Sequence, residues 1–122
     1  MIDSYFIKIE TTILYFHHII KSYSIENKII NESQGVIQGN ILFNNNYKLN
    51  FIEVKDIEIE NKDKYSYHFM NENENLIFRY DNARHHPEIN TFPHHKHLKN
   101  KIVESIELEL FDILIEVESN FL

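Results

Sequence analysis

Residues 35–52 read GVIQGNILFNNNYKLNFI, and this stretch decides the fold class. Apolar side chains alternate with other residues at Ile37, Ile41 and Phe43 before three asparagines, and the alternation resumes at Leu49 after them. A period of two is typical of strands, in which successive side chains point to opposite faces of a sheet. Consecutive asparagines favour a turn. The stretch therefore predicts two antiparallel strands joined by a hairpin.

The same alternation extends from Ser22 to about Glu104 and is interrupted by polar clusters that favour turns. These clusters lie at residues 31–35, 44–46, 60–64 and 71–75. Short strands that follow one another with turns between them form a meander. We therefore expect a sheet of five or six antiparallel strands.

Two neighbouring segments also predict how their strands pair. Tyr67 and Phe69 share one face of a strand, and Leu76 and Phe78 share one face of the next. If all four side chains face the core, Phe69 pairs with Leu76 and Tyr67 with Phe78.

The two ends of the chain have helical spacing instead. Apolar residues recur at intervals of three or four at Ile2, Phe6, Ile9, Ile13, Phe16 and Ile20, and again at Ile106, Leu110, Ile113, Leu114, Val117 and Phe121. The first pattern changes to strand near His17 or His18. The sequence thus predicts an α+β fold with an N-terminal helix, the meander sheet and a C-terminal helix, in which the helices cover one face of the sheet.

Composition limits the function further. The chain has 122 residues, a formal net charge of -7, two Gly and no Cys. One domain over residues 1–122 is expected at this length. The charge is unlike that of a general nucleic-acid binder, and the missing cysteines exclude a disulfide scaffold and a thiol nucleophile. No apolar run could span a membrane and no signal peptide is evident, so we expect a cytoplasmic protein.

One segment carries most of the candidate chemistry. Residues 78–97 read FRYDNARHHPEINTFPHHKH and contain five of the eight histidines and both prolines. Proline restricts the residue before it, which stiffens the loop. Residues 76–103 have five Lys or Arg against two acids, a net +3, while the remaining residues have seven against seventeen, a net -10. A phosphate ester would therefore be attracted to this segment.

Histidine beside arginine suits cleavage of RNA without a metal. One imidazole takes the 2′-hydroxyl proton and another gives a proton to the leaving oxygen, while arginine or lysine stabilises charge on the phosphoryl oxygens. The catalytic candidates are His95 with His97, supported by His85 or His86 and by Arg79. The substrate-binding candidates are Arg84 and Lys96 for phosphate and Phe92, Tyr67 and Tyr80 for stacking on a base.

Other interpretations of the same residues stay open. Arg79 and Asp81 suit a surface ion pair as well as a site, and His94, of opposite strand parity, suits packing. The spacing of His95 and His97 also suits a metal, with Glu88 or Glu53 as oxygen ligand, although the nearby cations oppose this and we assign no cofactor. A third alternative is a non-catalytic interaction module.

The C-terminal segment has a different character. Residues 102–122 hold six acidic residues and no Lys or Arg. A solvated helix face explains this pattern, and a docking surface for a basic partner is the alternative.

The histidine segment closely resembles the signature of the TumE toxin-antitoxin family. The matching runs are residues 79–88, RYDNARHHPE, and residues 91–97, TFPHHKH. Similar stretches occur at residues 22–25, 35–43, 49–53 and 65–68, so that the resemblance covers roughly residues 19–118. Arg84 departs from the motif, in which Pro usually stands.

This resemblance implies a toxin that is paired with a helix-turn-helix antitoxin. Ribonuclease activity, with RNA as the substrate, is inferred from the histidine and arginine chemistry and not from the resemblance. We expect no membrane partner, and a homodimer is left open. The motif marks Arg79, Asp81, Asn82, His85, His86, Thr91, Phe92, Pro93, His95 and His97, with Glu53 and His68 as supporting candidates. His68 is placed near Arg79 by the predicted strand pairing.

Overall fold

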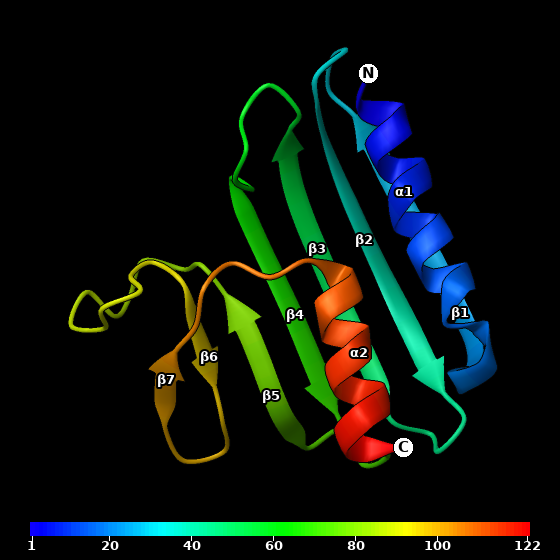
Figure 1. The fold of residues 1–122 in the computed structure, drawn as a ribbon, viewed down its shortest axis with the longest axis vertical. Helices are drawn as coiled ribbons and strands as arrows, with labels where there is room; N and C mark the ends of the chain where they lie inside the picture. The colour runs from blue at the N-terminus through cyan, green and yellow to red at the C-terminus, as the bar shows by residue number, and fades with distance from the viewer.

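The computed structural model describes residues 1–122 as two helices and one sheet (Figure 1). The elements in order are α1 (Ile2–Tyr15), a short 3-10 helix (His17–Ile19), β1 (Ile20–Ile29), β2 (Gln34–Phe43), β3 (Lys48–Asp56), β4 (Lys64–Met70), β5 (Leu76–Asp81), β6 (His95–His97), β7 (Ile102–Glu104) and α2 (Leu110–Phe121). All neighbouring strands are antiparallel and follow chain order across the sheet. Neither helix is long and apolar enough to cross a bilayer.

The α+β class and the meander are confirmed, with seven strands in place of the five or six expected. The difference lies at one edge of the sheet, where β6 and β7 have three residues each. Strands of three residues show too little alternation for their boundaries, and therefore for the number of strands, to be determined from a sequence. This edge nevertheless matters, because β6 carries two of the candidate catalytic histidines.

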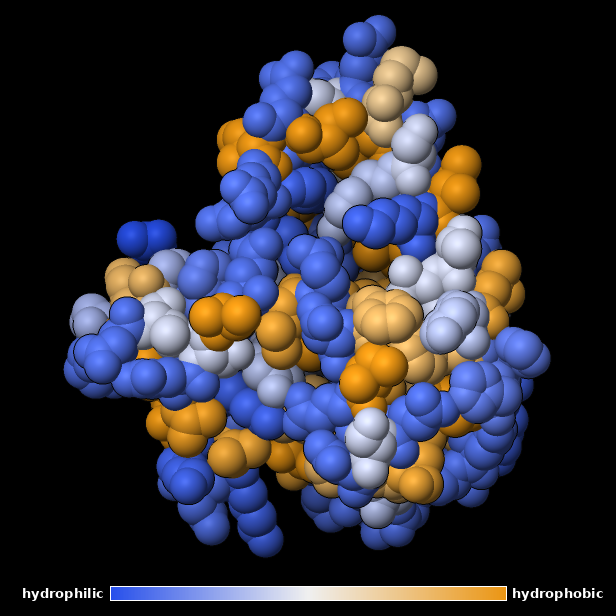
Figure 2. Space-filling view, in the orientation of Figure 1, coloured by the Kyte–Doolittle hydropathy of each residue, from blue (hydrophilic) through white to orange (hydrophobic).

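Both helices lie on the same face of the sheet and form the core with it (Figure 1). The core side chains of α1 are Ile2, Phe6, Ile9 and Ile13, and those of α2 are Leu110, Ile113, Leu114 and Val117. They pack against alternate residues of the strands, because every second side chain points to the covered face. Figure 2 views the molecule from this side, where apolar residues lie among hydrophilic ones.

The predicted pairing of β4 with β5 is wrong by two residues. Phe69 lies opposite Phe78, and Tyr67 lies opposite Tyr80. Within the loop at residues 71–75, the side chain of Asn71 accepts hydrogen bonds from two backbone N–H groups, and a bulge follows Phe69, so the loop and the bulge together set the observed pairing. A shift of two residues keeps every side chain on its predicted face.

The C-terminal helix is shorter than the apolar spacing predicted. It begins at Leu110, where Glu109 and Asp112 form a capping box, and Ile106 lies before it and is exposed. Most of the acidic side chains here have partners within the chain. Glu107 and Glu109 contact Lys62, Glu116 contacts Lys96, and Glu118 contacts His18. The structure thus uses these charges internally, which supports neither a purely solvated face nor a free acidic docking surface.

Candidate functional site

The pairing of β5 with β6 brings four candidate residues together. Arg79 lies opposite His97, and Asp81 lies opposite His95. All four side chains point to the face of the sheet that the helices leave open, since alternate residues of paired strands share a face. We call Arg79, Asp81, His86, His95 and His97 the histidine cluster.

The carboxylate of Asp81 lies at the centre of the histidine cluster. Its oxygens accept a hydrogen bond from Arg79 Nε at 2.8 Å and lie 3.0 Å from His95 Nε2 and 3.4 Å from His97 Nε2. Only 4% of Asp81 is exposed. A buried carboxylate needs such partners, because an unpaired charge away from water is costly.

The imidazoles form a hydrogen-bonded chain. His95 Nδ1 lies 2.9 Å from the carbonyl oxygen of Pro93, and His95 Nε2 lies 2.8 Å from His97 Nε2. Arg79 Nη2 lies 3.2 Å from the same His97 nitrogen, which must accept because guanidinium has no acceptor. His95 therefore donates through Nδ1 to Pro93, and its Nε2 lies within hydrogen-bond distance of both Asp81 and His97. The chain fixes the orientation of both rings.

His86 completes the cluster from the loop between β5 and β6. Its ring centroid lies 5.1 Å from that of His95 and 5.7 Å from that of His97. Ring nitrogens of the three histidines all lie within 4.8 Å of one another. His85, the other candidate at this position, is exposed and lies outside the group. The neighbouring Glu88 lies 3.4 Å from His86 Nδ1.

Two candidates of the motif hold the loop in place. The side-chain oxygen of Asn82 accepts a hydrogen bond from the backbone N–H of Tyr65 at 3.0 Å, and its amide donates to the carbonyl oxygen of Asp63. Thr91 donates to the His94 carbonyl oxygen at 2.6 Å and accepts from the backbone N–H of Ser105. Both residues thus position the histidine cluster without being part of it.

His94 packs away from the cluster. Its Nδ1 lies 2.8 Å from the hydroxyl of Tyr65, and the two rings stack with an interplanar angle of 15°. This is the packing that its strand parity suggested, since His94 is the residue immediately before His95 and points to the opposite side.

Arg84 and Phe92 lie beside the cluster. The Arg84 guanidinium stacks on the Phe92 ring at 4.9 Å. Arg84 also lines a hollow of about 400 Å³ together with Arg79, Asp81 and Ser66. The hollow offers two guanidinium groups to a phosphate next to the imidazoles.

Three predicted substrate-binding residues lie on the wrong face of the sheet. Lys96 alternates with His95 and His97, so it points to the helix side and binds Glu116 at 2.8 Å, above the ring of Tyr80. Tyr67 is fully buried and donates a hydrogen bond to Glu53 at 2.8 Å. Tyr80 is 6% exposed. None of the three side chains can touch a molecule bound at the histidine cluster.

Glu53 is a supporting candidate that the structure also separates from the cluster. It is fully buried on the helix-covered face, where Tyr5 and Tyr67 donate hydrogen bonds to its two oxygens. Burial raises the pKa of this carboxyl, against the opposing effects of Lys62 and of the two hydroxyls. Glu53 therefore supplies no ligand or base to the histidines.

The environment of the open face lowers two histidine pKa values. Burial lowers the pKa of His97, and Arg79 lowers it further, against the opposing charge of Asp81. Burial and then Arg79 also lower the pKa of His68, which lies opposite Arg79 on β4. Both shifts favour the neutral ring, and a neutral ring can accept a proton.

The sequence analysis missed a second hollow on the same face. It has a volume of about 340 Å³ and extends from His68 across β3 and β2 to β1. Asn40 and Asn50 contribute to its lining. A signal for this hollow was present in the sequence. Asn40 is next to the core residue Ile41 and Asn50 is next to the core residue Leu49, so strand alternation places both amides on the open face.

Comparison with known proteins agrees with the motif. The model of the family described as Toxin TumE matches residues 9–121. No curated protein and no solved structure gives a significant match. The family match spans nearly the whole chain, including the second half of α1, the whole sheet with the histidine cluster, and α2. The chain therefore belongs to the TumE toxin family.

Proposed function

We propose that this toxin cleaves RNA at the histidine cluster. The observation that supports the proposal best is the meeting of three imidazoles, a guanidinium and a buried carboxylate on one open face. Imidazoles supply a base and an acid near neutral pH, and guanidinium stabilises negative charge on a phosphoryl group. These groups match the cleavage of a phosphodiester with an adjacent 2′-hydroxyl, which needs a base, an acid and stabilisation of the phosphoryl charge.

The exposure of the three rings suggests which of them act as base and acid in the reaction. The side chains of His86 and His97 are 26% and 19% exposed, while that of His95 is 2% exposed. His97 takes the proton of the 2′-hydroxyl, whose oxygen attacks phosphorus. The bond to the 5′-oxygen breaks, and that oxygen takes a proton from His86. The products are a 2′,3′-cyclic phosphate and a 5′-hydroxyl, and the two imidazoles have exchanged protonation states.

His95 and Asp81 act through their neighbours in this proposal. Both are buried, so they are positioning residues for His97 and Arg79. Beyond its Nε bond to Asp81 and its Nη2 bond to His97, Arg79 keeps Nη1 without a partner in the chain, and 39% of its side chain is exposed. It is therefore placed to bind the phosphoryl oxygens, with Arg84 next to it in the hollow.

Expression in a host that lacks the antitoxin tests this function. Wild-type protein should arrest growth, and purified protein should cleave single-stranded RNA to cyclic phosphate ends. His97→Ala should do neither. His85→Ala is the matched control, because His85 is an exposed histidine of the same loop outside the cluster. Equal growth arrest from wild type and His97→Ala would remove the histidine cluster from the toxic activity.

A metal-dependent enzyme is the second candidate, and one observation favours it. Ring nitrogens of His86, His95 and His97 converge within 4.8 Å, with the Asp81 carboxylate beside them. His95 donates through Nδ1 to the Pro93 carbonyl, which is how ligating histidines are commonly oriented. Three histidines with an open fourth position suit a catalytic zinc ion.

Elemental analysis and chelation separate the two candidates. Retention of a stoichiometric metal, together with loss of cleavage in EDTA and recovery with Zn²⁺, would support the metal enzyme. Full cleavage in EDTA by metal-free protein would support imidazole acid-base catalysis. His86→Ala should lower the metal content of the purified protein in the first case. In the second case neither wild type nor His86→Ala should hold a metal.

Membership of the toxin family implies an antitoxin partner. We propose a helix-turn-helix antitoxin that covers the open face around the histidine cluster, because blocking this face would also block the activity. Co-purification with the product of the adjacent gene tests the pairing. Arg84→Glu should weaken the complex, while Lys21→Glu on the distant strand β1 should not.

A further inference from the structure

One line of side chains crosses the open face from the histidine cluster to the opposite edge of the sheet. Strand pairing places one residue from each of six neighbouring strands in register along this line. The polar row consists of Ser24, Asn40, Asn50, His68, Arg79 and His97. All six side chains are polar, although a solvent-exposed sheet face can also carry apolar side chains.

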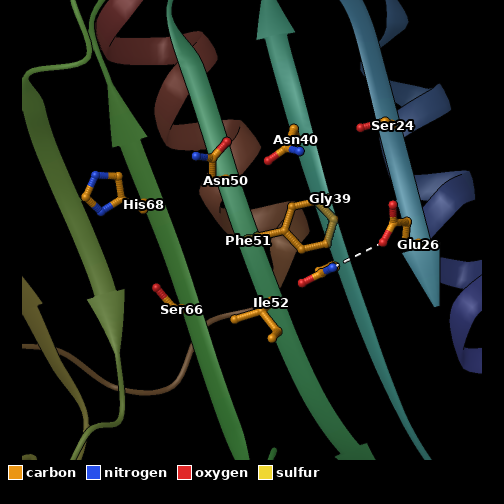
Figure 3. Close-up of a pocket in the computed structure, with 10 residues that line it drawn as sticks. Ser24, Glu26, Gly39, Asn40, Asn50, Phe51, Ile52, Ser66 and His68 are labelled. Atoms are coloured by element: carbon orange, nitrogen blue, oxygen red, sulfur yellow. Dashed lines mark hydrogen bonds between the residues drawn. The ribbon is translucent and has the colours of Figure 1, made fainter. Parts of the chain in front are cut away.

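The middle of the polar row lies in the hollow of about 340 Å³ (Figure 3). Figure 3 shows Ser24, Asn40, Asn50 and His68 along successive strands, with the helices behind the sheet. These four side chains make no hydrogen bond within the protein, whereas Gln38 in the same hollow binds Glu26. Their donors and acceptors are therefore available to a ligand.

The hollow continues into the site where the chemistry is proposed. Ser66 lines both this hollow and the one of about 400 Å³ that contains Arg79 and Arg84. His68 lies directly opposite Arg79. Positive charge is thus concentrated at the end with the histidine cluster, and neutral amides and hydroxyls follow it along the row.

We propose that the polar row binds the single-stranded RNA segment adjoining the cleaved bond, with Asn40 and Asn50 contacting base edges. The inference rests on the proposed ribonuclease function and adds the residues that would determine its sequence preference. Asparagine amides offer a donor and an acceptor side by side, which matches the edge of an unpaired base.

The dimensions of the polar row favour a strand over a mononucleotide. From His97 to Asn40 the row crosses four strand spacings, which is about 19 Å at 4.7–4.9 Å each. This length exceeds one nucleotide. The row has no exposed aromatic ring, so recognition here would depend on hydrogen bonds and not on stacking. Glu26 at the far end would repel further phosphates and limit the length bound.

Binding of a labelled 2′-O-methyl RNA hexamer by fluorescence anisotropy tests the inference, because this RNA lacks the 2′-hydroxyl and is not cleaved by the proposed reaction. The double variant Asn40→Ala/Asn50→Ala should bind about 25-fold more weakly than wild type, or about fivefold for each lost side chain. Asn27→Ala is the matched control, an exposed asparagine on the helix-covered face of β1, and should bind as wild type. A dinucleotide should bind wild type and the double variant equally.

The outcomes separate this inference from the proposed function. Hexamer binding that the double variant weakens supports the polar row, even if ordinary RNA is not cleaved, in which case only the proposed function fails. Cleavage of ordinary RNA with unchanged hexamer binding by the double variant overturns the polar row and leaves the proposed function intact. No hexamer binding by wild type, or equal affinity for dinucleotide and hexamer, also overturns the polar row. Circular dichroism of each folded variant accompanies these measurements.

Discussion

Two buried carboxylates lie in the same sheet on opposite faces, and their surroundings differ. Glu53 faces the helices and is held by the hydroxyls of Tyr5 and Tyr67. Asp81 faces the open side and is held by Arg79 and two imidazoles. The partners of Glu53 are buried or half-buried, while Arg79 reaches solvent. The comparison shows that burial alone does not indicate a reactive site, because reactivity also requires partners that a substrate can reach.

The difference follows from what covers each face. The helices close the Glu53 side, so its polar groups satisfy one another and serve stability. On the open face Arg79 stays accessible to solvent, and the loop between β5 and β6 brings His86 against His95 and His97. Charged side chains that reach solvent therefore remain on the open face, and such side chains are typical of sites that bind a ligand or catalyse a reaction.

The largest effect is expected from removing an exposed imidazole of the histidine cluster. His97→Ala should reduce RNA cleavage by at least about 100-fold, because general acid-base catalysis contributes roughly 10²–10⁴-fold. Glu53→Gln should leave the rate per folded molecule unchanged. A gel assay of labelled RNA with protein concentrations corrected for folded fraction measures both. A comparable loss in the two variants would show that the two carboxylate regions are not functionally distinct.

The free energy of unfolding should depend more on Glu53 than on His97. Glu53→Ala should lower the free energy of unfolding by about 3 kcal/mol, because it leaves two buried hydroxyls without an acceptor and creates a cavity. Urea unfolding gives the value, and Glu58→Ala, an exposed carboxylate near the end of β3, serves as the control. A loss no larger than that of the control would mean that Glu53 is not the structural centre of the covered face.

Removing one partner of Glu53 should have a smaller effect. Tyr67→Phe keeps the buried ring and deletes one hydrogen bond to Glu53, so the free energy of unfolding should fall by about 1–2 kcal/mol. Comparison of the urea midpoints of Tyr67→Phe, Glu53→Gln and the double variant measures the coupling. Strictly additive losses would contradict direct contact between the two side chains.

The two faces should also differ in the sign of their pH dependence. Burial raises the pKa of Glu53, so the native state holds its proton more tightly than the unfolded state does. Its contribution to stability is present below the ordinary value of 4.5 and is lost as pH rises through the raised pKa. Unfolding midpoints between pH 4 and 8 should therefore decline less steeply with rising pH in Glu53→Gln than in wild type. Parallel profiles would argue against the raised pKa.

On the open face the slope is reversed. Burial and Arg79 lower the pKa of His68, so its contribution is present above the ordinary value of 6.5 and is lost as pH falls through the lowered pKa. His68→Gln should remove part of the loss of stability below pH 6.5, and this is the smallest effect expected, since the ring is only partly buried. If the loss of stability below pH 6.5 is the same in His68→Gln and in wild type, His68 does not contribute to the pH dependence of this face.

The candidate site was predictable as a segment but not as a list of residues. The motif in residues 79–97 pointed to Arg79, Asp81, His86, His95 and His97, which do meet. Strand parity carried two further signals that went unused. Glu53 alternates in phase with the core residues Leu49 and Phe51, and Lys96 alternates out of phase with its neighbouring histidines. Both therefore had to face away from the cluster.

The sequence by itself determined the fold class, because alternation and helical spacing fix which side of each element is apolar. It also determined the location of the chemistry, since the histidines and cations are concentrated in one segment. Tertiary structure alone decided the pairing of β4 with β5, because shifts of two residues leave every face unchanged. It likewise decided that His86 and not His85 joins the cluster, and that the polar row aligns across six strands. These depend on loop geometry and register, which join residues far apart in the chain.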